Sequence, residues 1–102
     1  MFPLKKEGDI LQESTIEKRL KKEIELIGGK ALKFVSPGMS GVPDRIVLLP
    51  HGKLIFVELK APGEKPRPIQ NKRIKELRAL GFRVEIIDSI EKVLEFMEEV
   101  VV

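Results

Sequence analysis

The chain has 102 residues, no cysteine and a formal net charge of +3. This length suits one domain (1–102) with a single core, and the absence of cysteine excludes disulfides and thiolate zinc sites. The longest apolar runs, at 46–49, 54–57 and 100–102, are far shorter than the roughly 20 residues that cross a bilayer, so we expect a soluble, cytoplasmic protein with no membrane partner.

The first part of the chain predicts an arm and a helix. Residues 1–12 are mixed in character and are predicted to be a flexible arm. Ser14-Thr15-Ile16-Glu17 has the S-x-x-E spacing of a capping box, and apolar residues then recur at helical spacing until Gly28-Gly29. We therefore expect the first helix over 14–28.

The middle of the chain predicts three strands. The first covers 31–36, and the loop after it, 37–43, is rich in proline and glycine. Two further strands, over 44–49 and 53–60, flank Pro50-His51-Gly52 at the spacing of a hairpin. Because both of these strands are largely apolar, we expect them at the centre of a sheet.

The length of the hairpin loop decides which residue faces Glu58. A two-residue turn would place Arg45 opposite Glu58, whereas a three-residue loop would place Asp44 there. The three-residue class requires a left-handed residue at its third position, and Gly52 occupies that position. We therefore expect Asp44 and Glu58 to share one face of the hairpin.

The last third of the chain predicts a helix, a strand and a second helix. The first helix covers 68–80, begins at Pro68, which has no N–H to lose there, and ends at Gly81. A strand over 82–87 follows, and Asp88-Ser89-Ile90-Glu91 has the spacing of a capping box. The long crossover should make its flanking strands parallel. The predicted fold is α/β, in the order αβββαβα, with a mixed sheet flanked by helices.

Three charged side chains are predicted to meet at the end of the hairpin. Glu58 and Lys60 are two residues apart on one strand, so their side chains point to the same face, and the predicted register adds Asp44. Charges on a buried strand cost free energy unless they are paired, exposed or bound to a metal. Paired carboxylates are hard ligands that Mg²⁺ prefers, and a nearby lysine can orient a water and stabilise negative charge. The pattern favours phosphodiester hydrolysis at a metal site.

Other residues in the same order give the chain a family resemblance. Glu17 on the first helix, Gly41-Val42-Pro43-Asp44, Glu58-Leu59-Lys60 and Gln70 on the following helix together resemble the PD-(D/E)XK nuclease superfamily. Within that superfamily the chain is most similar to a stand-alone VRR-NUC domain of the phage and bacterial type. The resemblance implies a restriction-endonuclease-like αβββαβ core.

The resemblance also implies an activity and a set of site residues. The implied activity is metal-dependent DNA endonuclease cleavage in DNA repair, on Holliday junctions or other branched DNA, by a homodimer that uses Mg²⁺ or Mn²⁺. The implied metal ligands are Asp44, Glu58, the backbone carbonyl of Leu59, and Glu17. The implied catalytic residues are Asp44, Glu58, Lys60, Gln70 and Glu17.

Simpler explanations exist for the same residues. Asp44 could cap its own loop, and Glu58 with Lys60 could form an exposed pair on an edge strand. The capping box alone explains Glu17, and Gln70 could be an ordinary polar residue of a first helical turn. The alternative function is an inactive or accessory DNA-binding module of the same fold, although the intact acidic residues and lysine argue against it.

Basic residues dominate the second helix and its flanks. Between positions 65 and 83 there are seven basic residues against one acid. We expect phosphate contacts here because the predicted metal site lies beside this segment, although a solvated helix face is the alternative. The predicted DNA-binding residues are Lys72, Arg73, Lys75 and Arg45, of which Arg45 could instead pair with Glu85.

The number of active sites that a junction requires predicts the oligomeric state of the protein. One active site cuts one strand, whereas a four-way junction presents two symmetry-related strands, so a resolvase needs two sites. The apolar tail, 100–102, offers a surface for self-association unless it folds back onto its own core. We therefore expect a homodimer with two-fold symmetry.

Overall fold

The computed structural model describes residues 7–101 of the chain, and it describes side chains from residue 12 onward. The elements of this part, in chain order, are α1 (Glu7–Leu26), β1 (Lys30–Lys33), β2 (Arg45–Leu49), the 3-10 turn η1 (Pro50–Gly52), β3 (Lys53–Leu59), α2 (Pro68–Ala79), β4 (Arg83–Ile87) and α3 (Ile90–Val100). This order confirms the predicted α/β fold. Among these helices, none combines the length and the apolar character needed to cross a membrane.

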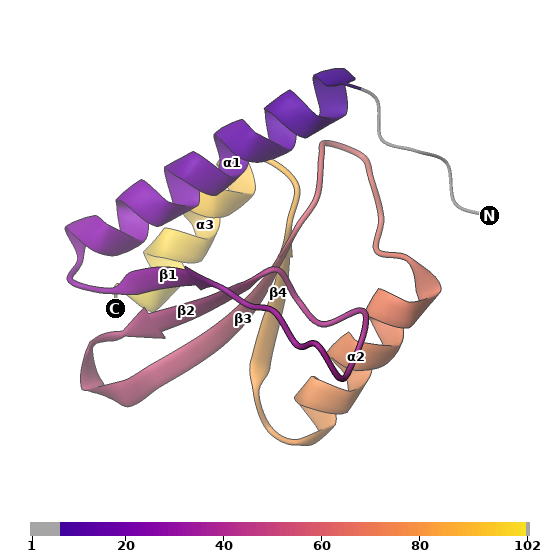
Figure 1. Cartoon of the computed structure of the whole chain (residues 1–102). Coiled ribbons are helices and arrows are strands. Elements are labelled where there is room, and N and C mark those ends of the chain that lie inside the picture. The colour runs from indigo at the N-terminus through magenta and orange to yellow at the C-terminus, as the bar shows by residue number, and fades with distance from the viewer. Residues whose placement is uncertain (1–6, 102) are drawn as a thin grey trace.

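The four strands form one mixed sheet in the order β1-β2-β3-β4. β1 pairs with β2 and β2 with β3 in antiparallel fashion, whereas β3 and β4, which are joined through α2, are parallel. Figure 1 shows α1 and α3 on one side of the sheet and α2 on the other. β3 is therefore a central strand that is covered on both faces.

The hairpin has the predicted register. Leu49 faces Lys53 and Arg45 faces Val57, so the next residue, Asp44, comes opposite Glu58. The three-residue connection is η1, in which both His51 and Gly52 have positive φ angles, of 70° and 77°. A left-handed glycine at the third loop position therefore accompanies the register that brings the two acidic residues to one face.

Helix α1 begins earlier than its sequence pattern predicts. It starts at Glu7, inside the segment predicted to be an arm, while residues 1–6 lie outside the described part. Ser14 lies inside the helix and so cannot be its N-cap, because a cap residue has non-helical backbone angles. The predicted capping box at 14–17 is wrong. The predicted apolar face is present, since three residues on it are buried, Ile16, Leu20 and Ile24.

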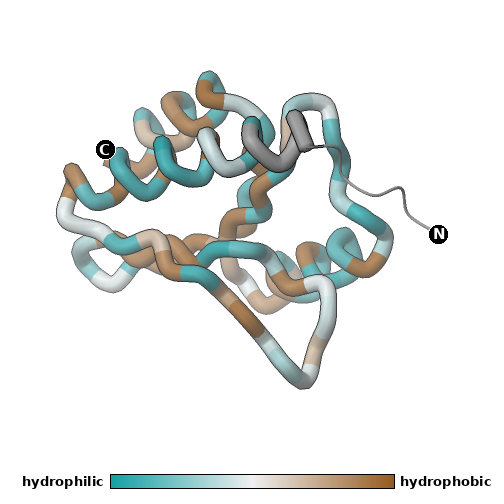
Figure 2. The backbone as a smooth tube through the Cα atoms, turned by 45° about the horizontal axis from the view of Figure 1, so that its top comes forward, coloured by the Kyte–Doolittle hydropathy of each residue, from teal (hydrophilic) through white to brown (hydrophobic). Residues whose placement is uncertain are grey.

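Side-chain alternation divides the strands between two cores. One face of the sheet packs against α1 and α3 and includes Val47 and Val57, and the other packs against α2 and includes Ile46 and Phe56. Figure 2 shows hydrophobic stretches (brown) of the backbone in the sheet that lies between the helices. The same alternation directs Arg45 toward α1 and Glu58 toward α2.

Several boundaries differ slightly from those predicted. β1 ends at Lys33, before the predicted end at 36, and α2 ends at Ala79. The last helix is capped by Ser89, whose hydroxyl accepts the Lys92 N–H at 3.1 Å, so the predicted box starting at Asp88 is one residue out of register.

The end of the chain divides between core and surface. Val100 packs against the core, which excludes it from the free surface expected of the tail. Val101 is exposed, and Val102 lies outside the described residues. Of the described tail, only Val101 therefore offers an exposed side chain.

Candidate functional site

Two buried ionisable side chains lie at the end of the central strand β3. Glu58 is 1% exposed and Lys60 is 4% exposed, and Lys60 Nζ lies 3.4 Å from Glu58 Oε2. Neither carboxylate oxygen of Glu58 has a hydrogen-bond partner. Because β3 is central and both side chains are buried, an exposed edge pair does not explain them. A buried carboxylate without hydrogen bonds is costly for the apoprotein, and this cost points to a ligand.

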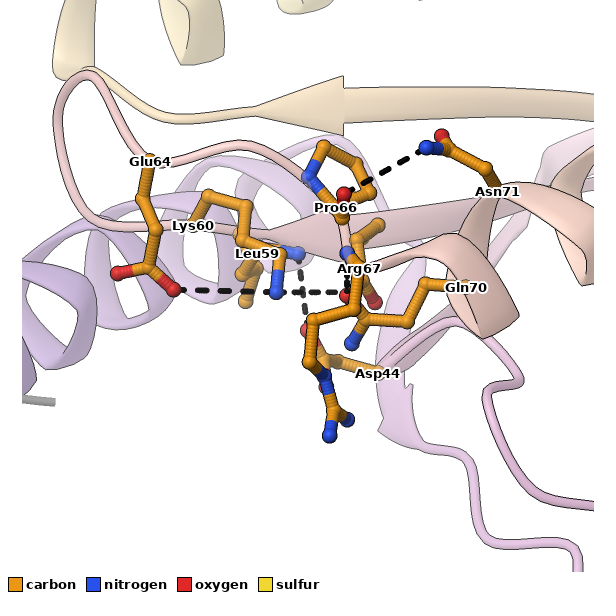
Figure 3. Close-up of polar contacts among 9 residues, drawn as sticks. Asp44, Leu59, Lys60, Glu64, Pro66, Arg67, Gln70 and Asn71 are labelled. Carbon is orange, nitrogen blue, oxygen red and sulfur yellow. Dashed lines mark hydrogen bonds and ion pairs between the residues drawn. The ribbon is translucent and has the colours of Figure 1, made fainter. Parts of the chain in front are cut away.

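Backbone contacts hold Asp44 beside Glu58. The Leu59 N–H donates a hydrogen bond to Asp44 Oδ2 at 2.9 Å, as Figure 3 shows. The Phe34 N–H donates to the Asp44 carbonyl oxygen at 2.8 Å and extends the pairing of the first two strands by one bond. Both the main chain and the side chain of Asp44 are therefore fixed at the place where β2 begins and β3 ends.

Close packing against α2 explains the glycine and proline that precede Asp44. Gly41 has a φ of +82°, and a Cβ at this position would lie 2.8 Å from the Ile69 carbonyl oxygen. Any larger residue would therefore be strained and would also collide with the first turn of α2. Pro43 is among the fully buried residues. The Gly-Val-Pro-Asp stretch thus packs tightly between α2 and the sheet, and this packing sets the position of Asp44.

The environment of Glu58 disfavours its charged form. Burial, together with the negative charge of Asp44, raises the pKa of Glu58 from its ordinary value of 4.5 to about 8, although Lys60 acts in the opposite direction. Glu58 therefore keeps its proton at neutral pH when no cation is present. A bound cation would reverse this preference, since it attracts both carboxylates and supplies the missing partner.

The donor set at this point fits a hard divalent cation. Asp44 and Glu58 offer carboxylate oxygens without competing thiol or imidazole ligands, which is the chemistry that Mg²⁺ and Mn²⁺ prefer. The uncompensated oxygens of Glu58 are the observation that supports this fit. Among the described side chains, those of residues 12–101, no three histidine or acidic groups gather as a metal-binding group. Side chains alone would therefore provide two ligands, and the remaining positions would fall to backbone oxygen and water.

Glu17 does not join this pair. Its carboxylate forms an ion pair with Arg45, whose side chain points to the α1 face of the sheet, opposite to the face of Glu58. The arrangement therefore does not support the predicted role of Glu17 as a ligand. The suggested pairing of Arg45 with Glu85 is also wrong, because the described partner of Glu85 is Arg83, at 2.7 Å.

Gln70 has the position of a first-turn polar residue and lies near the acidic pair, while its catalytic role stays a prediction. It is buried in the first turn of α2, and its side-chain oxygen accepts the Arg67 N–H at 2.8 Å. Figure 3 shows the Gln70 side chain reaching from the start of α2 toward Asp44. Gln70 therefore closes the N-terminus of the helix and lies at the side of the acidic pair.

Glu64 is a neighbour of the site that sequence reasoning missed. Its carboxylate lies 3.9 Å from Lys60 Nζ and is 29% exposed, so the lysine has an acidic group on each side (Figure 3). The signal was the spacing of four residues after Lys60. In a loop, that spacing does not predict a contact. Here a turn, closed by the hydrogen bond from the Glu64 N–H to the Ala61 carbonyl oxygen at 2.9 Å, places Glu64 near Lys60.

The predicted DNA-binding residues of α2 differ in accessibility. Lys72 and Lys75 are exposed. Arg73 is not free, since its Nε donates to the Ser40 carbonyl oxygen at 2.9 Å and its Nη1 lies 2.6 Å from Glu76. The lysines thus match the prediction of an outward basic face, whereas Arg73 departs from it.

Comparison with known proteins finds a matching family, a similar sequence and a similar solved structure. The model of the VRR-NUC domain family matches residues 4–91. A protein of Acyrthosiphon pisum secondary endosymbiont phage 1, named "Putative nuclease p44", is 58% identical over 80 residues, which cover 78% of this chain and 86% of the relative. A solved structure described as a VRR_NUC domain superposes with a TM-score of 0.81 at 34% identity, covering 85% of this chain and 95% of the other.

Proposed function

Because the chain belongs to the VRR-NUC domain family, a family of nucleases, we propose that it is a metal-dependent endonuclease that hydrolyses DNA, with Holliday junctions or other branched DNA as its substrate. The observation that carries the proposal is the buried Glu58 carboxylate, which lies beside Asp44 and Lys60 without a hydrogen-bond partner. A buried acidic pair that is costly in the apoprotein would be compensated by a bound cation.

The residues of the site have distinct roles in this proposal. Asp44, Glu58 and the backbone carbonyl of Leu59 would hold Mg²⁺ or Mn²⁺. When bound, such an ion lowers the pKa of a water molecule and offsets the charge of the phosphate. Lys60, held between Glu58 and Glu64, would donate hydrogen bonds to the attacking water and to the phosphate oxygens. Gln70 would keep the start of α2 in place beside Asp44.

A non-catalytic DNA-binding module of the same fold is the alternative. Phosphate binding requires exposed basic residues, which Lys72 and Lys75 supply. It does not require a buried acidic pair, and two carboxylates repel a phosphate unless a cation lies between them. The acidic pair therefore favours the enzyme over the module.

The proposal predicts cleavage that depends on the metal and on DNA structure. We expect the protein to cut DNA with Mg²⁺ or Mn²⁺ and to lose all activity in EDTA, because the proposed mechanism needs a divalent cation at the acidic pair to activate water. The measurement compares four labelled substrates of equal length, a four-way junction, a flap, a single strand and a plain duplex. Equal cleavage of all four substrates would contradict the proposed selectivity for DNA structure. Cleavage in EDTA at the rate seen with Mg²⁺ or Mn²⁺ would contradict the proposed metal dependence.

We also propose that the protein is a homodimer with two-fold symmetry, because a junction presents two equivalent strands and the site described here cuts one. Val101 and Leu94, which are 57% and 41% exposed, provide apolar surface near the end of the chain. Light scattering at micromolar concentration should give twice the mass of one chain. A monomer that stays monomeric on a four-way junction would rule out paired cleavage and leave a nicking or flap-cutting enzyme.

A further inference from the structure

Arg73 differs from the other basic residues of α2 in its surroundings. Its side chain is 15% exposed, whereas Lys72 and Lys75 are exposed residues. The guanidinium donates in two directions, to the Ser40 carbonyl oxygen at 2.9 Å and to the Glu76 carboxylate at 2.6 Å. Its charge is offset within the protein and two of its donors are in use. Arg73 is therefore poorly placed to serve as a phosphate contact.

Ser40 belongs to the segment that leads into Asp44. Residues 34–43 have no regular structure and separate β1 from β2. Two described contacts tie the second half of this segment to α2, namely the close approach of Gly41 to Ile69 and the bond from Arg73 to Ser40. Of these two contacts, the Arg73 bond is the hydrogen bond, and the other is packing. Without it, the segment would be held to α2 by packing at Gly41.

We propose that Arg73 is a positioning residue, which fastens the 37–43 segment to α2 and thereby sets Asp44 opposite Glu58. The planar guanidinium suits this role because its donors are fixed in one plane and hold two acceptors at set directions, whereas the rotatable ammonium of a lysine on its flexible stem fixes no such geometry. The inference rests on the proposed function, since it gives Arg73 a part in forming the metal site. It also explains why a basic residue on this helix is buried against a loop.

The charge-conserving variant Arg73→Lys separates positioning from phosphate binding. If Arg73 positions the loop, Arg73→Lys should lower kcat by roughly 10- to 100-fold, because small displacements of a ligand are costly in catalysis. The KM for DNA and the salt dependence of binding should stay unchanged. If Arg73 instead contacts phosphate, the lysine should keep most of the activity.

A readout without DNA tests the same inference independently of nuclease activity. In the free protein, hydrogen exchange at the Phe34 and Leu59 N–H groups, which bond to Asp44, should become faster in Arg73→Lys. The rise in melting temperature caused by Mn²⁺ should require about 10- to 100-fold more metal. Wild-type exchange and wild-type metal response would overturn the inference, whatever substrate the enzyme cuts.

Two controls use neighbouring residues of α2. Glu76→Ala removes the second partner of Arg73 but leaves the Ser40 bond, so it should keep wild-type exchange at both amides. The double variant Lys72→Ala with Lys75→Ala should lower the slope of log K against log salt by about 0.9 for each duplex phosphate that the protein no longer neutralises. A similar fall in slope for Arg73→Ala, with an unchanged metal response, would show that Arg73 contacts phosphate and would overturn the inference.

Discussion

Replacing Glu58 with glutamine, or Lys60 with alanine, is expected to abolish DNA cleavage while DNA binding persists. Glu58→Gln keeps the size of the side chain but removes one of the two carboxyl groups to which the proposed function assigns the metal. Lys60→Ala removes the buried ammonium that lies 3.4 Å from that carboxylate. Each change should lower the cleavage rate on the order of 10³-fold, which corresponds to about 4 kcal/mol of transition-state stabilisation.

Matched substitutions on α3 provide the controls. Glu98→Gln and Lys92→Ala make the same chemical changes at exposed positions of that helix, away from the acidic pair, and should leave cleavage at the wild-type rate. Binding of a labelled junction should be measurable for all four variants, because the exposed lysines of α2 are unchanged. Wild-type cleavage by either site variant in Mg²⁺ would show that the site has been placed wrongly.

The metal-free protein is expected to lose stability as the pH rises from about 4.5 to about 8. The pKa of Glu58 is about 8 in the folded protein and near 4.5 in the unfolded chain, so the folded state binds more protons between these values. Its contribution to stability is therefore fully present below 4.5 and is lost as the pH rises to the folded pKa. The slope reaches about 1.4 kcal/mol per pH unit within this window.

The variant Glu58→Gln isolates this effect from the other titrating groups. In EDTA it should be more stable than the wild type, and the difference in the free energy of unfolding should grow between pH 5 and 8 (roughly the window set by the two pKa values). Added Mg²⁺ or Mn²⁺ should stabilise the wild type at pH 8 and leave the variant unchanged. Urea titrations at several pH values measure both. A difference that stays constant with pH would mean that Glu58 is ionised in the metal-free protein.

Local patterns in the sequence were sufficient to predict the order of the helices and strands. They also predicted that Asp44, Glu58 and Lys60 lie together. The apolar runs and the breaker residues between them predict three helices and four strands, and the structure has them in that order. Alternation along a strand puts Glu58 and Lys60 on one face without any tertiary information. The loop class that places glycine at its third position gives the register at Gly52, and hence the pairing of Asp44 with Glu58.

Local patterns failed where a competing tertiary contact was stronger. The S-x-x-E spacing at 14–17 predicts a helix start, yet the helix runs through it from Glu7, so the two side chains have no free backbone N–H groups to cap. Glu17 is then available to Arg45, 28 positions further along the chain. No local pattern contains that pairing, because it depends on which face of the sheet α1 covers.

The sequence by itself therefore determined the type of fold, the hairpin register and the acidic pair with its lysine, because each follows from interactions within a few residues or across one short turn. Only the tertiary structure decided the partners of the remaining charged residues. Packing of α1 on one face of the sheet separates Glu17 from Glu58, and packing of α2 on the other brings Arg73 to Ser40. A turn in the loop after β3 returns Glu64 to Lys60. These contacts join segments whose relative positions are set when the elements pack and bury apolar surface. Because the hydrophobic effect is non-directional, it does not by itself specify which charged residues meet.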